Sequence, residues 1–355
     1  MCPVFTEFDT LKSGGFHNII LKQNGSVWTS GYNFYGQLGD GSKTDRKSFV
    51  KVISSSARAV AAGGYCSLVL KKDDSVWAAG NNFYGQLGDE SRTDRTSFVK
   101  VFSTDANAVA AGGWHSLVLA KNGSVWTTGW NKYGQLGDGS YTDRKTYVKV
   151  VPSEVKGVAA GDDYSMILKQ DGSVWTTGRN YNGQLGDDSK SARSVFIQVI
   201  ASGAKTVTAG GYHSMVLKQD GSVWSTGWNK YGQLGDGSTT DKTTYVQVIS
   251  RNVKAVAAGS RHSIVLKQDG SVWATGSNDK GQLGYDHEPD GRNVFMQVIS
   301  SKVQAVAAGV SHSIVLKQNG SIWTTGWNRY GQLGDGSTNS STIFVKVTQI
   351  SEGGA

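Results

Sequence analysis

The chain has 355 residues, including 47 Gly, 3 Pro and 11 Trp, and 38% of its residues are hydrophobic, 10% aromatic and 18% charged. This composition excludes a collagen-like chain, a long coiled coil and an intrinsically disordered chain. Lys and Arg number 36 against 28 Asp and Glu, and the net charge of +8 permits an anionic partner without requiring one. The sequence contains no run of about 18 apolar residues, so we expect no membrane-spanning helix.

The N-terminus and the cysteines bear on the compartment. The first nine residues lack a basic stretch followed by an apolar one, so we expect no secretion signal in the chain as given. Cys2 and Cys66 are the only two cysteines, too few for a disulfide framework. These features favour a reducing compartment, cytoplasmic or nuclear.

A repeat of 49 residues organises the whole chain. The Trp of a Gly-Ser-Val-Trp-like segment recurs at steps of 49, with a final step of 50, at Trp28, Trp77, Trp126, Trp175, Trp224, Trp273 and Trp323. A Gly-Gln-Leu-Gly segment keeps the same steps, beginning at Gly36, Gly85, Gly134, Gly183, Gly232, Gly281 and Gly331. The extra residue falls in the sixth copy, within 285–291.

Each copy contains four short β-rich segments, which in the fifth copy are 207–209, 213–217, 222–226 and 245–248. Asp220-Gly221, between the second and third segments, predicts a two-residue type I′ hairpin turn. Asp73-Asp74 makes this turn less favourable in the second copy. Helical periodicity is absent, so each copy is predicted to form one four-stranded antiparallel sheet.

The chain ends favour a closed ring over an open array of repeats. In the repeat register Val4 aligns with Ile53 and so follows the equivalent of Val347, which makes 4–347 seven whole copies cut in mid-repeat. Such a cut is expected where N- and C-terminal strands share a blade, and neither end resembles a polar cap. We therefore predict an all-β, seven-bladed β-propeller of four-stranded antiparallel blades. One propeller domain is expected over 1–355, with a short tail at 348–355 and the Ala-rich strands nearest the axis.

The repeat motifs also carry a family resemblance. Ala-Ala-Gly-x-x-His-Ser, Asp-Gly-x-Val-Trp-x-x-Gly-x-Asn and Gly-Gln-Leu-Gly resemble the regulator of chromosome condensation repeat family over essentially the whole chain. The resemblance implies the same seven-bladed propeller. Its members include an exchange factor for a Ran-type small GTPase, a plant UV-B photoreceptor and a bacterial inhibitor of β-lactamases, so the resemblance leaves the function open.

Candidate catalytic and metal-binding residues all fall at repeated positions. Five of the six His share one position, with Cys66 and Tyr164 in the other two copies: His17, His115, His213, His262 and His312. A ring of metal ligands is the alternative to a His that bonds the preceding Gly turn or the next blade, and we favour the second. A turn-forming Asp follows Gly-Gln-Leu-Gly in six copies: Asp40, Asp89, Asp138, Asp187, Asp236 and Asp335. No catalytic motif stands outside the repeat, so we expect neither an enzyme nor a cofactor nor a metal.

The positions that vary between copies predict the binding surface. Strand direction brings the residue before the His position and the residue before the repeated Asn to the same face. In copy order these pairs are Phe16 and Tyr32, Tyr65 and Asn81, Trp114 and Trp130, Asp163 and Arg179, Tyr212 and Trp228, Arg261 and Ser277, and Ser311 and Trp327. Eight of the fourteen are aromatic, and aromatic and Arg residues are typical of binding hot spots. The competing interpretation is that Trp130, Trp228 and Trp327 fill gaps between blades.

We therefore predict a non-enzymatic binding scaffold whose aromatic-rich face engages a protein partner or a second copy. One alternative is an exchange factor or chromatin adaptor for a Ran-type small GTPase. Nucleic acid could then meet the opposite face, where Lys precedes the hairpin turn at Lys22, Lys71, Lys169, Lys218, Lys267 and Lys317. The other alternative is a lectin, because stacked aromatic rings suit sugars.

Overall fold

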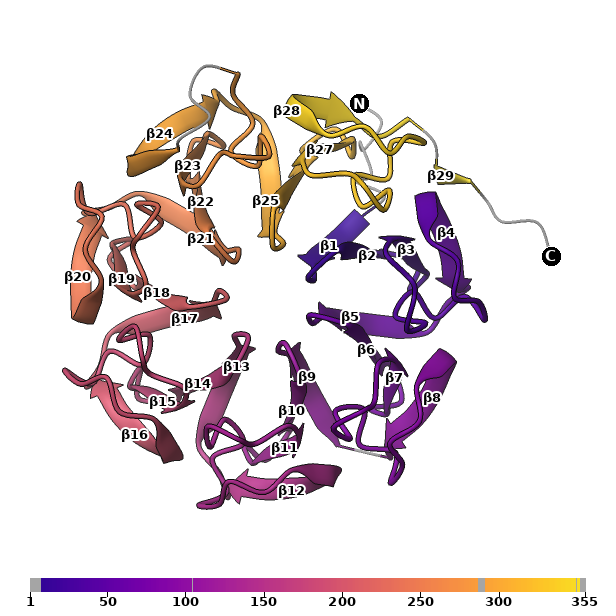
Figure 1. Cartoon of the computed structure of the whole chain (residues 1–355), viewed down its shortest axis with the longest axis vertical. Helices are drawn as coiled ribbons and strands as arrows, with labels where there is room; N and C mark the ends of the chain where they lie inside the picture. The colour runs from indigo at the N-terminus through magenta and orange to yellow at the C-terminus, as the bar shows by residue number, and fades with distance from the viewer. Residues whose placement is uncertain (1–7, 104, 287–290, 349, 352–355) are drawn as a thin grey trace, which may run out of the picture.

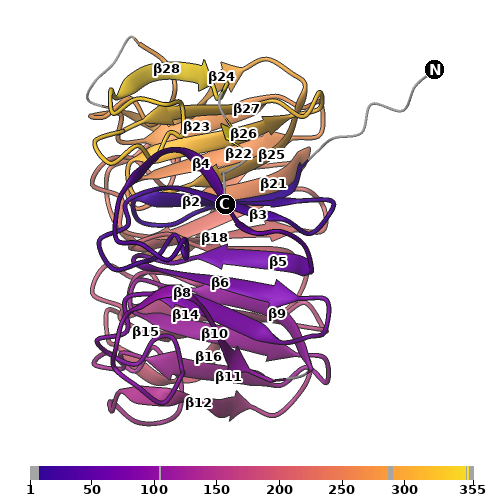
Figure 2. The same ribbon diagram turned by 90° about the vertical axis from the view of Figure 1, so that its right-hand side faces the viewer.

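The structure, a computed structural model, describes residues 8–103, 105–286, 291–348 and 350–351. Seven β-sheets stand around a central axis in a closed ring (Figure 1), and Figure 2 shows the ring edge-on. The described residues form no helix. The predicted all-β, seven-bladed propeller is confirmed, whereas Val4 and the extra residue expected within 285–291 involve positions outside the described residues.

Each blade is built from four consecutive strands, ordered from the axis outward. The innermost strands are β1 (Phe8–Ser13), β5 (Ala57–Ala62), β9 (Ala106–Ala111), β13 (Val155–Ala160), β17 (Ala204–Ala209), β21 (Val253–Ala258) and β25 (Val303–Ala308). The second strands are β2 (His17–Lys22), β6 (Cys66–Lys71), β10 (His115–Ala120), β14 (Tyr164–Lys169), β18 (His213–Lys218), β22 (His262–Lys267) and β26 (His312–Lys317). The third strands are β3 (Val27–Gly31), β7 (Val76–Gly80), β11 (Val125–Gly129), β15 (Val174–Gly178), β19 (Val223–Gly227), β23 (Val272–Gly276) and β27 (Ile322–Gly326). The outer strands are β4 (Arg46–Ile53), β8 (Arg95–Phe102), β12 (Arg144–Val151), β16 (Arg193–Ile200), β20 (Lys242–Ile249), β24 (Arg292–Ile299) and β28 (Ser341–Lys346). We number the blades 1 to 7 in this order.

The Ala-rich strands lie nearest the axis, as predicted (Figure 1). Glycines follow these strands and line the axial channel, and a Cβ on Gly112 would lie 2.5 Å from the carbonyl oxygen of Gly161 in the next blade. Backbone hydrogen bonds join neighbouring blades at this level, as from Gly64 N to Gly112 O at 2.9 Å. Small residues are required because seven strands crowd around one axis.

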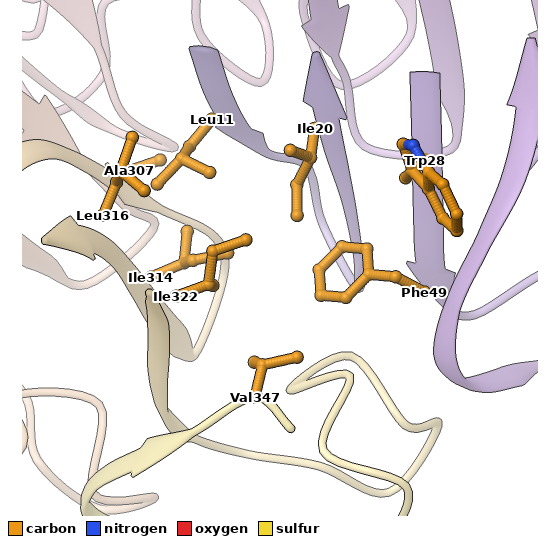
Figure 3. Close-up of a cluster of buried hydrophobic side chains, with 9 residues drawn as sticks. All are labelled: Leu11, Ile20, Trp28, Phe49, Ala307, Ile314, Leu316, Ile322 and Val347. Carbon is orange, nitrogen blue, oxygen red and sulfur yellow. The ribbon is translucent and has the colours of Figure 1, made fainter. Parts of the chain in front are cut away.

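Hydrophobic cores lie between blades, and one of them closes the ring. Leu11 and Ile20 of blade 1 pack with Ile314 and Ile322 of blade 7 and with Val347, which follows β28 (Figure 3). Burying these apolar side chains stabilises the seam by the same hydrophobic effect that joins the other blades. The seam therefore holds the two ends of the chain together.

The two terminal strands share a sheet, although not in the form expected. The short strand β29 (Ile350–Ser351) pairs in parallel with β4, in the sheet that begins with β1. It adds a fifth strand at the outer edge, because the four main strands of blade 1 all come from the N-terminal segment. The part of the predicted tail that is described thus joins blade 1.

The hairpin turns differ from the type I′ prediction. Gly221 N donates to Lys218 O at 3.1 Å, Lys218 N donates to Ser222 O at 2.9 Å, and Gly221 has a φ of +80°. This is a three-residue loop, a type I turn followed by a left-handed glycine. In blade 2 Asp74 takes that left-handed position with a φ of +64°.

Candidate partner-binding face

Two sets of loops open on the same face of the ring. The short loop between the first and second strands of a blade meets the long loop between its third and outer strands, since Trp130 N donates to Trp114 O at 2.9 Å in blade 3. The same bond joins Tyr32 to Phe16 and Trp228 to Tyr212. We call this the aromatic face, and the opposite face, with the hairpins between second and third strands, the lysine face.

The repeated His fixes the short loops by bonding the next blade, as predicted. His115 Nε2 lies 2.8 Å from Ser165 Oγ, and this hydroxyl donates to Gln135 O at 2.7 Å. Since the hydroxyl hydrogen is used, the imidazole donates from Nε2, and its buried Nδ1 is without a hydrogen-bond partner. Burial lowers the pKa of His115 to about 3. Within the part of the chain that the structure describes, no three His, Cys, Asp or Glu side chains form a metal-binding group.

In six of the seven blades a buried Asn bonded to a half-buried Asp fixes the long loop, shown here for blade 3. Asn131 Nδ2 donates to Asp138 at 3.0 Å, and Asn131 Oδ1 accepts from Leu136 N at 3.0 Å. Asp138 also accepts from Ser140 N at 2.9 Å and from Arg144 at 2.8 Å. Burial opposes ionisation of Asp138, but hydrogen bonds from Ser140 and Arg144 outweigh it and lower the pKa. The predicted turn role of the repeated Asp is confirmed, and the loops that carry the aromatic rings are rigid.

Aromatic rings make contact from blade to blade across the first half of the face. The Trp327 ring centroid lies 5.3 Å from that of Phe16, which lies 6.4 Å from that of Tyr65. Tyr65 lies 4.8 Å from Trp114. Tyr32 joins this group through Phe16, at 6.3 Å. These predicted residues therefore form one continuous cluster over blades 7, 1, 2 and 3.

Arginines continue the series across the second half. The Arg179 guanidinium lies 5.2 Å from the Tyr133 ring centroid and 5.3 Å from that of Tyr212. The Tyr212 and Trp228 centroids are 5.6 Å apart. Beyond them, Arg261 lies 5.2 Å from the Tyr231 ring, which itself contacts Trp228 at 5.3 Å. We call the whole series, from Trp327 through blades 1 to 5 to Arg261, the aromatic belt.

The belt is open between Arg261 of blade 6 and Trp327 of blade 7. Ser277 is buried at the position that carries an aromatic ring in most other blades, and Asp279 and Lys280 are exposed beside it. In blade 7 the position before the His carries Ser311, and the aromatic series resumes at Trp327. The face is therefore asymmetric, although the ring that carries it is nearly seven-fold.

The predicted residues differ in accessibility. Half-buried side chains form the largest group: Phe16, Tyr32, Tyr65, Trp114, Trp130, Arg179, Tyr212, Trp228 and Trp327. Arg261 is exposed, whereas Asp163 is only 6% exposed and pairs with Arg179 at 2.9 Å. Asp163 therefore orients Arg179 instead of facing outward, and Asn81 is likewise buried. Trp130, Trp228 and Trp327 contact neighbouring rings, mostly edge to face, and each also presents part of its surface.

Two further sets of rings belong to the face and were not predicted. The Tyr before Gly-Gln-Leu-Gly links the predicted rings, as Tyr84 does between Trp114 at 5.6 Å and Trp130 at 5.4 Å. Phe34, Phe83 and Tyr181 project further, with 58%, 63% and 52% of their surface exposed. These three rings occupy the position directly after the repeated Asn, where the other copies carry Lys, Arg or Asp. This variation between copies was the signal in the sequence that could have identified them.

The lysine face has a different chemistry. The lysines before the hairpin turns lie over the Trp rings of the third strands, as Lys218 does over Trp224 at 4.2 Å. Each of these six ammonium groups therefore makes a cation–π contact, and in four blades an Asp of the same turn lies close by, as Asp220 does beside Lys218. The predicted ring of lysines is present, with its charge partly offset by these carboxylates.

Comparison with known proteins identifies the family. The RCC1-like domain matches residues 99–355, and the regulator of chromosome condensation (RCC1) repeat matches 9–37 and 57–86, and also 24–70 and 73–119. The chain belongs to the regulator of chromosome condensation repeat family. No curated protein sequence matches it.

Solved structures support the same fold. Prp20p of Saccharomyces cerevisiae, described with its binding properties to Gsp1p and histones, superposes with a TM-score of 0.84 at 22% identity over 94% of this chain and 88% of its own. Human WBSCR16 superposes with a TM-score of 0.82 at 23% identity over 91% of this chain and 93% of its own. Among the described residues, no helix has the length and apolar character needed to cross a membrane.

Proposed function

We propose that this protein is a binding scaffold that holds a protein partner, or a second copy of itself, on its aromatic face. The observation that carries the proposal is the aromatic belt, in which rings and guanidinium groups contact one another from Trp327 of blade 7 through blades 1 to 5 to Arg261 of blade 6. Rigid aromatic and Arg side chains bury large areas at little entropic cost, which is the composition of protein-binding hot spots.

The hydrogen bonds that hold the loops of the aromatic face favour binding over catalysis. The loops are fixed by buried Asn–Asp pairs, and the His that sequence inspection singles out are turned inward to the next blade. Preorganised side chains lose little freedom when a partner docks, so more of the contact energy remains as affinity. The relatives' recorded partners, Gsp1p and histones for Prp20p and Kap60 for yeast RCC1, are proteins.

The proposal is tested by capture of partners from the native source. Trp114→Ala/Trp228→Ala removes two rings from opposite parts of the aromatic face, and we expect the specifically bound protein to be lost. Each substitution should cost about 1 to 2 kcal/mol of stability, because the rings are half-buried and contact neighbouring rings. Mass spectrometry identifies the proteins retained by the wild type and lost by the variant.

A matched control separates lost contact from lost stability. Trp175→Ala/Trp273→Ala removes two half-buried tryptophans that lie under Lys169 and Lys267, away from the aromatic face. This variant should melt at a similar temperature to the first and still capture the partner. Equal recovery by all three proteins would contradict the proposal and move the site to the lysine face or the outer rim.

The exchange-factor and lectin alternatives remain separate predictions with their own assays. Release of labelled nucleotide from a Ran-type GTPase would favour the first, together with salt-dependent DNA binding through the lysine face. Retention on a glycan array, lost with Trp114→Ala, would favour the second. The cytoplasmic or nuclear compartment stays a prediction that imaging of the tagged chain can check.

A further inference from the structure

A lysine lies on the third-strand tryptophan in six of the seven blades. The lysines come from the end of the second strand, and their ammonium groups lie 3.5–4.7 Å from the centroids of the Trp rings. The pairs are Lys22–Trp28, Lys71–Trp77, Lys169–Trp175, Lys218–Trp224, Lys267–Trp273 and Lys317–Trp323. The fold thus contains the same ammonium position, defined by an aromatic ring, six times.

Blade 3 lacks this lysine. Ala120 occupies the position in the chain, and the following Lys121 directs its ammonium group to the carboxylate of Asp74 in blade 2. Lys149 lies 5.1 Å from the Trp126 centroid, but it comes from the outer strand. Its equivalent Lys51 lies 5.4 Å from Trp28 in blade 1, where Lys22 is also present. Lys149 therefore does not replace the missing group.

A pocket between blades 2 and 3 opens at this place. Phe102, Trp126 and Tyr147 line it, with Phe102 5.7 Å from Trp126 and 5.6 Å from Tyr147 between ring centroids. Ala120 completes the wall where the other blades carry the stem of a lysine. The Trp126 ring therefore lies at an ammonium position that this blade leaves without its second-strand lysine, and a ring face of this kind binds alkylammonium groups.

The charge of the pocket also favours a cation. Glu90 and Asp105 line it together with Lys149, so carboxylates exceed ammonium groups. In the equivalent groove between blades 1 and 2, Lys51 and Lys71 outnumber Asp40. Blade 2 thus supplies acidic side chains at the groove whose own lysine is missing.

We propose that this pocket binds the side chain of a lysine on a partner polypeptide. We choose a lysine as the occupant because a lysine side chain of this protein fills the equivalent position in the six other blades. The site lies in the outer groove between blades 2 and 3 and is independent of the aromatic face. Its failure or success therefore leaves the proposed function of that face unaffected.

The test measures binding of Nα-acetyl-L-lysine methylamide to the full chain by saturation-transfer NMR. Nα-acetyl-L-norleucine methylamide, which lacks only the amine, serves as the neutral probe. Ala120→Lys should place the chain's own lysine over Trp126 and weaken binding of the lysine probe at least tenfold. Gln219→Lys, which adds the same charge to the hairpin turn of blade 5, should leave binding unchanged.

A gain of function complements this loss. Lys71→Ala should vacate the equivalent position over Trp77 and raise the number of lysine-probe sites from one to two. Melting curves establish that each variant is folded, which is expected for Ala120→Lys because six blades already accommodate lysine there. Equal binding of the norleucine probe, or undiminished binding by Ala120→Lys, would overturn the proposal. Binding of spermidine without binding of the lysine probe would overturn it as well.

Discussion

Asp162 is a charged residue at a position where the six other blades carry an uncharged one. It lines the axial channel at the position where most blades carry a second glycine, as at Gly113. Burial, and next to it the negative charge of Asp163, raises the pKa of Asp162 to about 7, although Arg179 acts in the opposite direction. The folded protein therefore holds this proton more tightly than the unfolded chain, in which an Asp titrates near 3.8.

The shift predicts a pH-dependent gain of stability for Asp162→Asn. The proton bound in the folded state stabilises it fully below about pH 4, and this contribution is lost as the pH rises to about 7. The variant should be more stable than the wild type at pH 8, and the difference should shrink towards pH 5. Urea unfolding at both pH values measures it, and a difference independent of pH would contradict the assigned ionisation.

At the scale of elements, the hairpins between the second and third strands show what the repeat requires locally. Gly221 has a left-handed φ of +80°, and a Cβ there would lie 3.0 Å from Asn252 N. Blade 2 nevertheless accommodates Asp74 at the equivalent position, so the cost of a side chain is moderate.

Gly221→Ala should lower the free energy of unfolding by about 1 to 2 kcal/mol, the usual cost of the left-handed region for a residue with a Cβ. Gly221→Asn should lose less, because the Asn side chain tolerates that region. Chemical denaturation of both variants checks the order. A larger loss for Asn than for Ala would show that steric contact with Asn252, and not backbone conformation, decides the cost.

The sequence patterns predict the number and order of the blades correctly, but they predict the conformation of the hairpin loops less well. The period of 49 residues and the four β-rich segments of each copy predict the ring, because strand spacing and repeat number leave little choice of architecture. The type I′ turn was wrong, since Asp-Gly also fits a three-residue loop, and only the hydrogen bonds of Lys218 distinguish the two.

The candidate site was predicted in part for a similar reason. Strand direction brings Trp114 and Trp130 to one face, but the linking role of Tyr84 was hidden because repeated residues were assigned to the fold. Asp163 is buried and pairs with Arg179 of its own blade, a pairing that strand direction does not predict. Its partner Arg179 was identified correctly as part of the face.

At the scale of the whole molecule, the His–Ser bonds join blades around the ring. Each His lies on a second strand and reaches the next blade, and the last, His312, reaches Asn18 of blade 1 at 2.9 Å. Burial lowers the pKa of all five, to about 4 for His17 and His213 and about 3 for His115, His262 and His312. The repeated His therefore joins the blades and also makes the stability of the ring sensitive to acid.

The whole ring should lose stability as the pH falls below about 6.5. The unfolded chain binds a proton on each His near that pH while the folded protein keeps all five neutral, so stability is complete above pH 6.5 and declines towards pH 4. His115→Cys, which copies Cys66 of blade 2, should reduce the slope by about 1.4 kcal/mol per pH unit. Melting and denaturation curves between pH 7 and pH 4 measure it, and an unchanged slope would contradict a neutral buried His115.

The central claim is that the aromatic face, and not the lysine face, binds the partner. Hydrogen–deuterium exchange of the full chain, with and without the partner captured from the native source, tests it most directly without any substitution. We predict that protection on binding appears in the loops after the third strands, such as 32–35, 81–84 and 130–133, and spares the hairpin turns. Protection of the hairpin turns at 23–25, 170–172 and 219–221, with the aromatic loops unchanged, would contradict the account.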